Sequence, residues 1–148
     1  LAKHKATSHE GGICTPMVAY WPKGMTSTGG WNHEPVHLVD IMSTVLDLSH
    51  QKYPLKFNGK QTKPLQGTSL VPTFSQKALA QRKFIMGFDF ANSKAVRKGK
   101  WKLVSYKKGP WELYDMSKDR TETLNLARQN PELVETLKKE FDQWIANL

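Results

Sequence analysis

The chain has 148 residues, of which 39% are hydrophobic and 24% charged, proportions typical of a globular protein rather than a disordered one. Its single cysteine excludes an internal disulfide framework and a zinc site built from several cysteines. The formal net charge is +9 at pH 7, and no apolar run approaches the roughly 20 residues that a membrane-spanning helix needs.

The first informative segment lies at the start of the chain, where Lys5 precedes the sequence Glu10-Gly11-Gly12. Because glycine has no side chain, this pair allows the backbone to approach a ligand closely, beside the charge of the lysine. Residues 17–21 form an apolar run, which predicts entry into a buried strand. The segment therefore indicates the edge of a strand, with Lys5 facing an anion.

Residues 22–75 are predicted to hold one helix between two loops. Over residues 35–48 apolar side chains recur at helical spacing, and Pro35 suits the first turn of a helix. We expect this helix to cover a sheet. Residues 49–75 contain several prolines and glycines without sustained periodicity, which predicts a long connection of the kind that often borders a functional cleft.

The second half of the chain is predicted to be an antiparallel sheet. Short β-like segments are separated by glycine-containing turns at hairpin spacing, and they lie at residues 84–88, 95–97, 101–106 and 111–114. Residues 101–106 alternate between apolar and polar side chains, as a half-buried strand does.

A final helix is predicted to begin at Asn130-Pro131-Glu132, with Asn130 as the side-chain cap. Its apolar positions repeat at helical spacing and should form one stripe against the sheet. Within that stripe we expect four buried side chains, namely Leu133, Leu137, Phe141 and Trp144. A boundary between two structural pieces is expected near residues 76–82.

Basic residues are concentrated between positions 82 and 108, which hold nine lysines and arginines and one acidic residue. Such a region attracts polyanions by long-range steering. One interpretation is a surface for sulfated glycan or nucleic acid, with Trp101, Tyr106 and Trp111 as stacking residues. The other is a basic face that is merely solvated, and the sequence leaves both open.

Five segments, in their order and approximate spacing, resemble the sulfatase family. The first combines Lys5, the Glu-Gly-Gly sequence and an apolar stretch that ends in Trp-Pro. The others are residues 35–48, the Gly-Thr-Ser-Leu sequence at 67–70, residues 95–103 and residues 112–127, which include Leu-Tyr-Asp and Asn-Leu-Ala. The resemblance covers nearly the whole chain and is limited to the C-terminal part of a sulfatase.

This resemblance implies an α+β fold that forms the C-terminal part of an α/β sulfatase fold of the alkaline-phosphatase-like superfamily. Residues 1–81 would be the C-terminal end of the large α/β domain, including its last strand and helix. Residues 82–148 would be the C-terminal subdomain, a small antiparallel sheet packed by a C-terminal helix.

The resemblance also implies that the complete enzyme hydrolyses sulfate esters, either aryl sulfates or sulfated carbohydrates, with a formylglycine nucleophile and calcium. Both would be supplied mostly by a missing N-terminal part, so we expect neither bound metal nor activity in this chain alone. Membrane and nucleic acid are not expected partners, and a periplasmic, secreted or lysosomal-like compartment is implied. Phosphate or phosphonate ester hydrolysis, found in the same superfamily, and a basic polyanion-binding module are the alternatives.

Lys5 is the predicted catalytic and substrate-binding residue, because it matches the lysine that contacts the sulfate group in sulfatases. A compact ammonium on a long stem suits contact with a tetrahedral anion. His9 is a second, weaker candidate for substrate binding, although packing is its favoured role. Glu10 is expected to fix the glycine turn through backbone N–H groups, and Cys14 is expected to be buried rather than the nucleophile.

Overall fold

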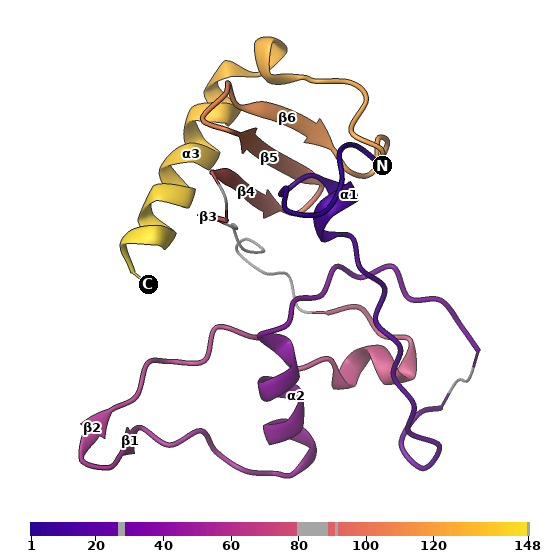
Figure 1. Cartoon of the computed structure of the whole chain (residues 1–148). Coiled ribbons are helices and arrows are strands. Elements are labelled where there is room, and N and C mark those ends of the chain that lie inside the picture. Colours follow the sequence, from indigo (N-terminus) through magenta and orange to yellow (C-terminus); the bar gives the residue numbers. More distant parts are fainter. Residues whose placement is uncertain (27–28, 80–88, 91, 148) are drawn as a thin grey trace. The chain divides into compact units, whose positions relative to one another are not determined.

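The computed structural model describes residues 1–26, 29–79, 89–90 and 92–147 (Figure 1). The chain forms two compact units, one made of Leu1–Met17 with Arg82–Leu148 and the other of Val18–Gln81. Helices and small antiparallel sheets make up the fold, which confirms the predicted α+β class. Within the described ranges, no helix is long and apolar enough to cross a membrane. The first unit takes in residues 1–17, whereas the predicted domains divide the chain at 81/82, and that division into domains stays a prediction.

A four-stranded antiparallel sheet forms the centre of the first unit (Figure 1). Its strands follow one another in chain order: β3 (Asp89–Phe90), β4 (Ser93–Lys98), β5 (Trp101–Tyr106) and β6 (Glu112–Asp115). Lys98 pairs with Trp101 across a two-residue turn, in which Gly99 takes a φ of 55° that glycine adopts without a steric penalty. The predicted sheet and hairpin are confirmed, while the predicted strand at 84–88 lies outside the described residues.

One face of this sheet packs against α3 (Pro131–Ala146), which begins where the sequence predicts. Val96, Leu103 and Leu113 from the strands meet Val134, Leu137 and Phe141 from the helix in one core. Leu137 and Phe141 are therefore buried as expected.

Three details of α3 differ from the prediction or extend it. Leu133 and Trp144 are only partly buried, because they pack at the rim of the core, where the ring centroid of Trp144 lies 5.9 Å from that of Phe141. Asn130 makes no side-chain cap, and its amide instead donates to the carbonyl oxygen of Leu126. The helix start thus depends on Pro131 at its first position.

The opposite face of the sheet is also covered, so that β5 is buried on both sides. Ala95, Val104, Tyr114 and Met116 form a second apolar cluster there. The interpretation of residues 101–106 as a half-buried strand was therefore wrong, since Lys102 too is buried. The residues that bury it come from α1 (Glu10–Ile13) and from the loop after β6, which leads into η2 (Ala127–Gln129).

In the second unit the predicted helix is shorter than expected, because α2 runs from Asp40 to Leu48. Its start is fixed by Asp40, whose carboxylate accepts hydrogen bonds from the backbone N–H groups of His37 and Thr68. Thr44 accepts another from the N–H of Leu70. The side of α2 that faces the 67–70 segment is therefore polar, and the apolar side chains of Ile41, Met42, Val45 and Leu48 are exposed.

The apolar run at residues 17–21 does not form the predicted strand. Val18 and Tyr20 are 91% and 87% exposed, and no other segment that the structure describes pairs with this run. A strand needs a neighbour to satisfy its backbone hydrogen-bonding groups, which explains the difference. The predicted connection at 49–75 contains three short elements, β1 (Lys56–Phe57), β2 (Lys60–Gln61) and η1 (Val71–Ser75).

Candidate functional site

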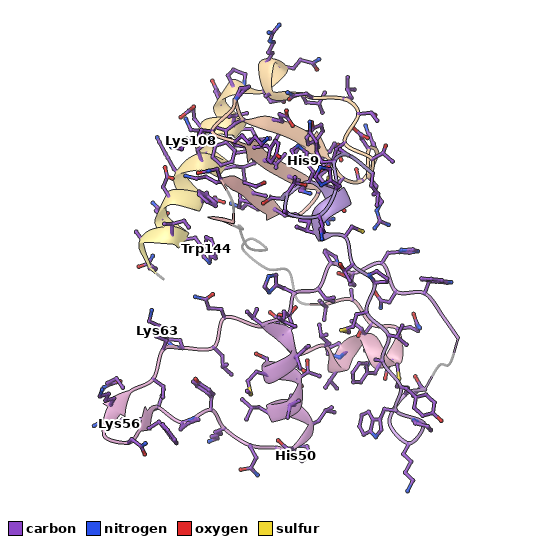
Figure 2. The ribbon with its side chains drawn as sticks, viewed as in Figure 1. His9, His50, Lys56, Lys63, Lys108 and Trp144 are labelled. Atoms are coloured by element: carbon purple, nitrogen blue, oxygen red, sulfur yellow. The ribbon has the colours of Figure 1, made fainter. Side chains whose placement is uncertain are left out.

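The candidate site is built on the N-terminal segment, which lies against the sheet through a run of buried residues at positions 7–10. The backbone N–H of Ser8 donates to Ser93 Oγ over 2.7 Å. His9 is enclosed over the sheet (Figure 2), and its Nε2 lies 2.8 Å from Glu112 Oε2. Both contacts join residues about a hundred positions apart, so the segment is held by tertiary structure.

A buried group of three charges provides the third attachment. Lys102 Nζ lies 2.7 Å from both Glu10 Oε1 and Glu122 Oε1, and the second contact is an ion pair rather than a well-directed hydrogen bond. The side chains of Lys102 and Glu122 are 1% and 0% exposed. The other oxygen of Glu122 accepts the N–H of Glu10 over 2.7 Å. Burial lowers the pKa of nearby Arg97, and the charge of Glu10 opposes that effect.

The glycine pair has a different role from the predicted one. A Cβ at Gly11 would lie 2.3 Å from the carbonyl oxygen of Lys3, and one at Gly12 would lie 2.0 Å from that of Thr7. The N–H of Gly11 also donates to the carbonyl oxygen of Ala2. Absence of side chains therefore allows the first residues of the chain to fold back onto α1, and the close approach is between two parts of the backbone.

Lys5 lies in this folded-back stretch and is exposed. Among the residues the structure describes, its ammonium has no ion-pair partner. Its role as the catalytic and substrate-binding lysine is untested by these contacts and stays a prediction. Lys5 and His9 are not brought together, because one side chain faces solvent and the other is buried.

His9 is placed as an anchor of the segment. Its ring lies edge-on to Tyr106, with centroids 6.4 Å apart, while its Nδ1 is buried without a hydrogen-bond partner in the described part of the chain. Glu112 also accepts a hydrogen bond from Tyr114, whose pKa is raised first by burial and then by this bond. A substrate contact by His9 stays a prediction.

Two further predictions about this segment were wrong. The Glu10 carboxylate does not fix the glycine turn through backbone N–H groups, because it pairs with Lys102. Cys14 is exposed rather than buried, since it follows the last residue of α1 where the chain leaves the sheet.

Sequence reasoning missed the residues that hold the segment, Lys102 and Glu122. The available signal was a lysine in the middle of a strand, between Trp101 and Leu103, where a buried charge requires a partner. Nothing in the local sequence identifies that partner, because Glu10 is 92 residues away.

The carboxylates of this site are not arranged to bind calcium. Calcium prefers six to eight oxygen ligands, several of them carboxylates. Across the described ranges, no group of three or more histidine, cysteine, aspartate or glutamate side chains is arranged to hold an ion. The carboxylates of Glu10 and Glu122 are instead neutralised by Lys102, so the residues present do not fit a calcium site.

The loop that presents Glu122 is organised by Asp119. Hydrogen bonds from the N–H groups of Leu124 and Thr123, each 2.8 Å long, lower the pKa of Asp119 to about 2. An unfolded aspartate has a pKa of about 3.9, so Asp119 stabilises the fold above that pH and this contribution is lost as the pH falls towards 2.

We therefore expect Asp119→Asn to lower stability at pH 5–7 and the difference from the unmodified chain to shrink between pH 4 and pH 2. The free energy of unfolding by urea, measured for both proteins across this range, provides the check. A difference that stays constant down to pH 2 would contradict the role given to the Asp119 carboxylate.

Comparison with known proteins assigns the sequence of the chain to a family. The sequence signature described as "N-sulphoglucosamine sulphohydrolase, C-terminal" matches residues 4–147. No curated protein sequence matches the chain significantly.

Solved structures share the fold. One, called BT33336S-sulf, comes from work on the metabolism of multiple glycosaminoglycans by Bacteroides thetaiotaomicron, with 24% identity and a TM-score of 0.55 over 70% of this chain and 24% of that one. Ps i-CgsB, alone and in complex with k-i-k-neocarrahexaose, has 22% identity and a TM-score of 0.62 over 77% of this chain and 25% of that one. The chain spans about a quarter of the length of these proteins. Since the family signature covers nearly all of its residues, the chain belongs to the N-sulphoglucosamine sulphohydrolase C-terminal family, as a sulfatase C-terminal portion.

Proposed function

We propose that this chain is the C-terminal part of an enzyme that hydrolyses sulfate esters, and that Lys5 contacts the sulfate group of the substrate. The observation that carries the proposal is the setting of Lys5. Its side chain is exposed and unpaired within the described ranges, on a segment held by Ser8, His9 and Glu10. A charge on an anchored backbone can meet a substrate without first breaking an ion pair.

The chemical role of Lys5 follows from its charge. Negative charge accumulates on the sulfate oxygens as the bond between sulfur and the ester oxygen breaks. A positive group already in place stabilises that charge without reorganising at the moment of reaction. Lysine suits this task because its ammonium is a compact charge with three donors.

The remaining parts of the proposal concern the complete enzyme. Formylglycine as nucleophile, calcium, and a periplasmic, secreted or lysosomal-like compartment are inferred from the family resemblance alone. The described residues of this chain fit no calcium site, so we propose that the ligands for calcium belong to the rest of the enzyme. We further propose that the chain is inactive by itself and that its substrate is a sulfated carbohydrate or an aryl sulfate. Two structural relatives support the carbohydrate, since their descriptions name glycosaminoglycan metabolism and a bound neocarrahexaose.

The test is the substitution Lys5→Ala in the enzyme that contains this chain. We expect kcat/KM for an aryl sulfate to fall about 10²- to 10³-fold, as when one donor to a developing oxyanion is removed. Lys5→Arg should recover part of the loss because the positive charge is kept.

The matched control is Lys118→Ala, which removes an exposed lysine of the same unit and should leave kcat/KM unchanged. An unchanged kcat/KM in Lys5→Ala would overturn the role of Lys5. Faster turnover of the matching aryl phosphate or phosphonate ester by the unmodified enzyme would favour the alternative reaction.

A further inference from the structure

Positive charge gathers at the ring of Tyr106, the last residue of β5. Lys3 Nζ lies 5.8 Å from the centroid of this ring, and Lys107 Nζ lies 5.2 Å from it. Lys108, labelled in Figure 2, follows in the same turn, which the N–H of Gly109 closes on the carbonyl oxygen of Tyr106. The N-terminal segment and the β5–β6 turn thus bring Lys3 and Lys107 to one aromatic side chain, with Lys108 next in the turn. Tyr106 and these three lysines are here called the Tyr106 cluster.

The backbone of all three lysines is unusual. Lys3, Lys107 and Lys108 have φ values of 60°, 52° and 60°, in the left-handed region that glycine and asparagine occupy more easily. Non-glycine residues adopt this conformation only where the surrounding structure holds them in it. Lys107 and Lys108 take it one after the other in the β5–β6 turn, where both side chains are exposed.

The three lysines also lack the carboxylate partners that their neighbours have. On β4 and β5, or in the turn between them, Lys98 pairs with Glu140, Lys100 with Asp115, and Lys102 with two glutamates. Among the described residues, no acidic side chain pairs with Lys3, Lys107 or Lys108.

The carboxylate of Glu112 offers no exception. It is taken up by His9 and by Tyr114, and the His9 ring lies edge-on to that of Tyr106. Lys98, Lys100 and Lys102 are thus neutralised within the fold, whereas Lys3, Lys107 and Lys108 have no such carboxylate among the described residues.

We propose that Lys3, Tyr106, Lys107 and Lys108 form a binding site for a sulfated polysaccharide chain, separate from the contact that Lys5 makes with the reacting sulfate. Sulfate groups along such a chain would pair with the compact ammonium groups, and the Tyr106 ring would hold Lys3 and Lys107 close together through its contacts with both. The positive cluster would also raise the local concentration of the polyanion. The choice of a sulfated glycan rests on the proposed function, while the site itself rests on the cluster.

Nucleic acid fits the same charges less well. Binding of single strands uses several aromatic rings on which successive bases stack. Trp111 is unsuitable because it packs edge-on against Phe141, with centroids 5.8 Å apart, and Trp101 packs against the same core. Tyr106 is left as a single ring with lysines already over it.

The experiment measures binding of the 148-residue chain to heparin by titration calorimetry across a salt series. In the variant Lys3→Gln/Lys107→Gln/Lys108→Gln, we expect affinity at low salt to fall about tenfold or more. By analogy with counterion release from other polyanions, the slope of log Kd against log salt should fall by about two to three. The control variant Lys52→Gln/Lys56→Gln/Lys60→Gln removes the same charge from exposed lysines of the other unit and should change both quantities little.

Acetylation of lysines followed by mass spectrometry tests the same site without substitutions. Heparin should protect Lys3, Lys107 and Lys108 and leave Lys52, Lys56 and Lys60 reactive. Equal protection of both sets, or equal loss of affinity in both variants, would overturn the site. Binding of fully desulfated heparin or of single-stranded DNA as tightly as heparin would overturn the ligand class. If Lys5→Ala left kcat/KM unchanged while heparin still bound at the Tyr106 cluster, the result would contradict the proposed function alone.

Discussion

Replacing Lys102 by methionine is expected to lower the free energy of unfolding by about 3–5 kcal/mol, since removal of one partner leaves a buried charge uncompensated. Here two carboxylates, Glu10 and Glu122, would remain in a space that is almost closed to water. Methionine has a similar length and leaves little cavity, so the loss would report charge rather than volume. Urea unfolding followed by circular dichroism provides the measurement.

A rescue variant separates the charge from packing. In Lys102→Met/Glu10→Gln/Glu122→Gln no buried charge remains, and buried ion pairs can be exchanged for neutral groups at little net cost. We expect this variant to recover a large part of the lost stability. If Lys102→Met alone changes stability by less than 1 kcal/mol, the buried ion group does not hold the N-terminal segment on the sheet.

The substitution Phe141→Ala is expected to lower the free energy of unfolding by about 3–5 kcal/mol. The ring of Phe141 is 1% exposed and lies between Trp111 and Trp144 on the face of the sheet that α3 covers. The loss combines the apolar surface no longer buried with the cavity that remains, because the two tryptophans can close the space only in part. Urea unfolding of the variant and the unmodified chain, at one pH, gives the difference.

Leu124→Ala is the control for this experiment. Leu124 belongs to the same unit and is also apolar, but it is 60% exposed, so its truncation should change stability by no more than about 0.5 kcal/mol. A cost for Phe141→Ala as small as that of Leu124→Ala would show that α3 is not packed through Phe141.

The parts of the fold that the sequence predicts well are governed by local chemistry. The β4–β5 hairpin follows from Gly99 between two short β-like segments, and the start of α3 follows from Pro131. Leu137 and Phe141 could be assigned to the core because helical periodicity places both on one stripe.

The parts that could not be predicted depend on partners far away in the chain. The alternation in 101–106 indicated a solvated face, yet Lys102 is buried because Glu10 and Glu122 reach it. The setting of His9 likewise depends on Glu112, which is 103 residues away. For Lys5 the local pattern indicated only a lysine that faces an anion, and its role as the sulfate contact came from the family resemblance.

In the second unit the sequence predicted burial where the structure shows exposed side chains. Apolar residues at 17–21 and along α2 indicated burial, but Val18, Tyr20, Ile41 and Met42 are exposed. Periodicity reports which side chains would gain from burial, and it cannot report whether a surface is present to cover them.

The closure of the sheet by the first residues of the chain has a consequence for biosynthesis. The partners of residues 8–10, namely Ser93, Lys102 and Glu112, are synthesised 85 to 103 residues after them. Contacts of such long sequence separation form slowly, because the entropy of closing the intervening chain is lost before they contribute. Glu10 therefore stays without its partner until Lys102 has emerged, and attachment of residues 8–10 to the sheet should follow formation of the β4–β5 hairpin.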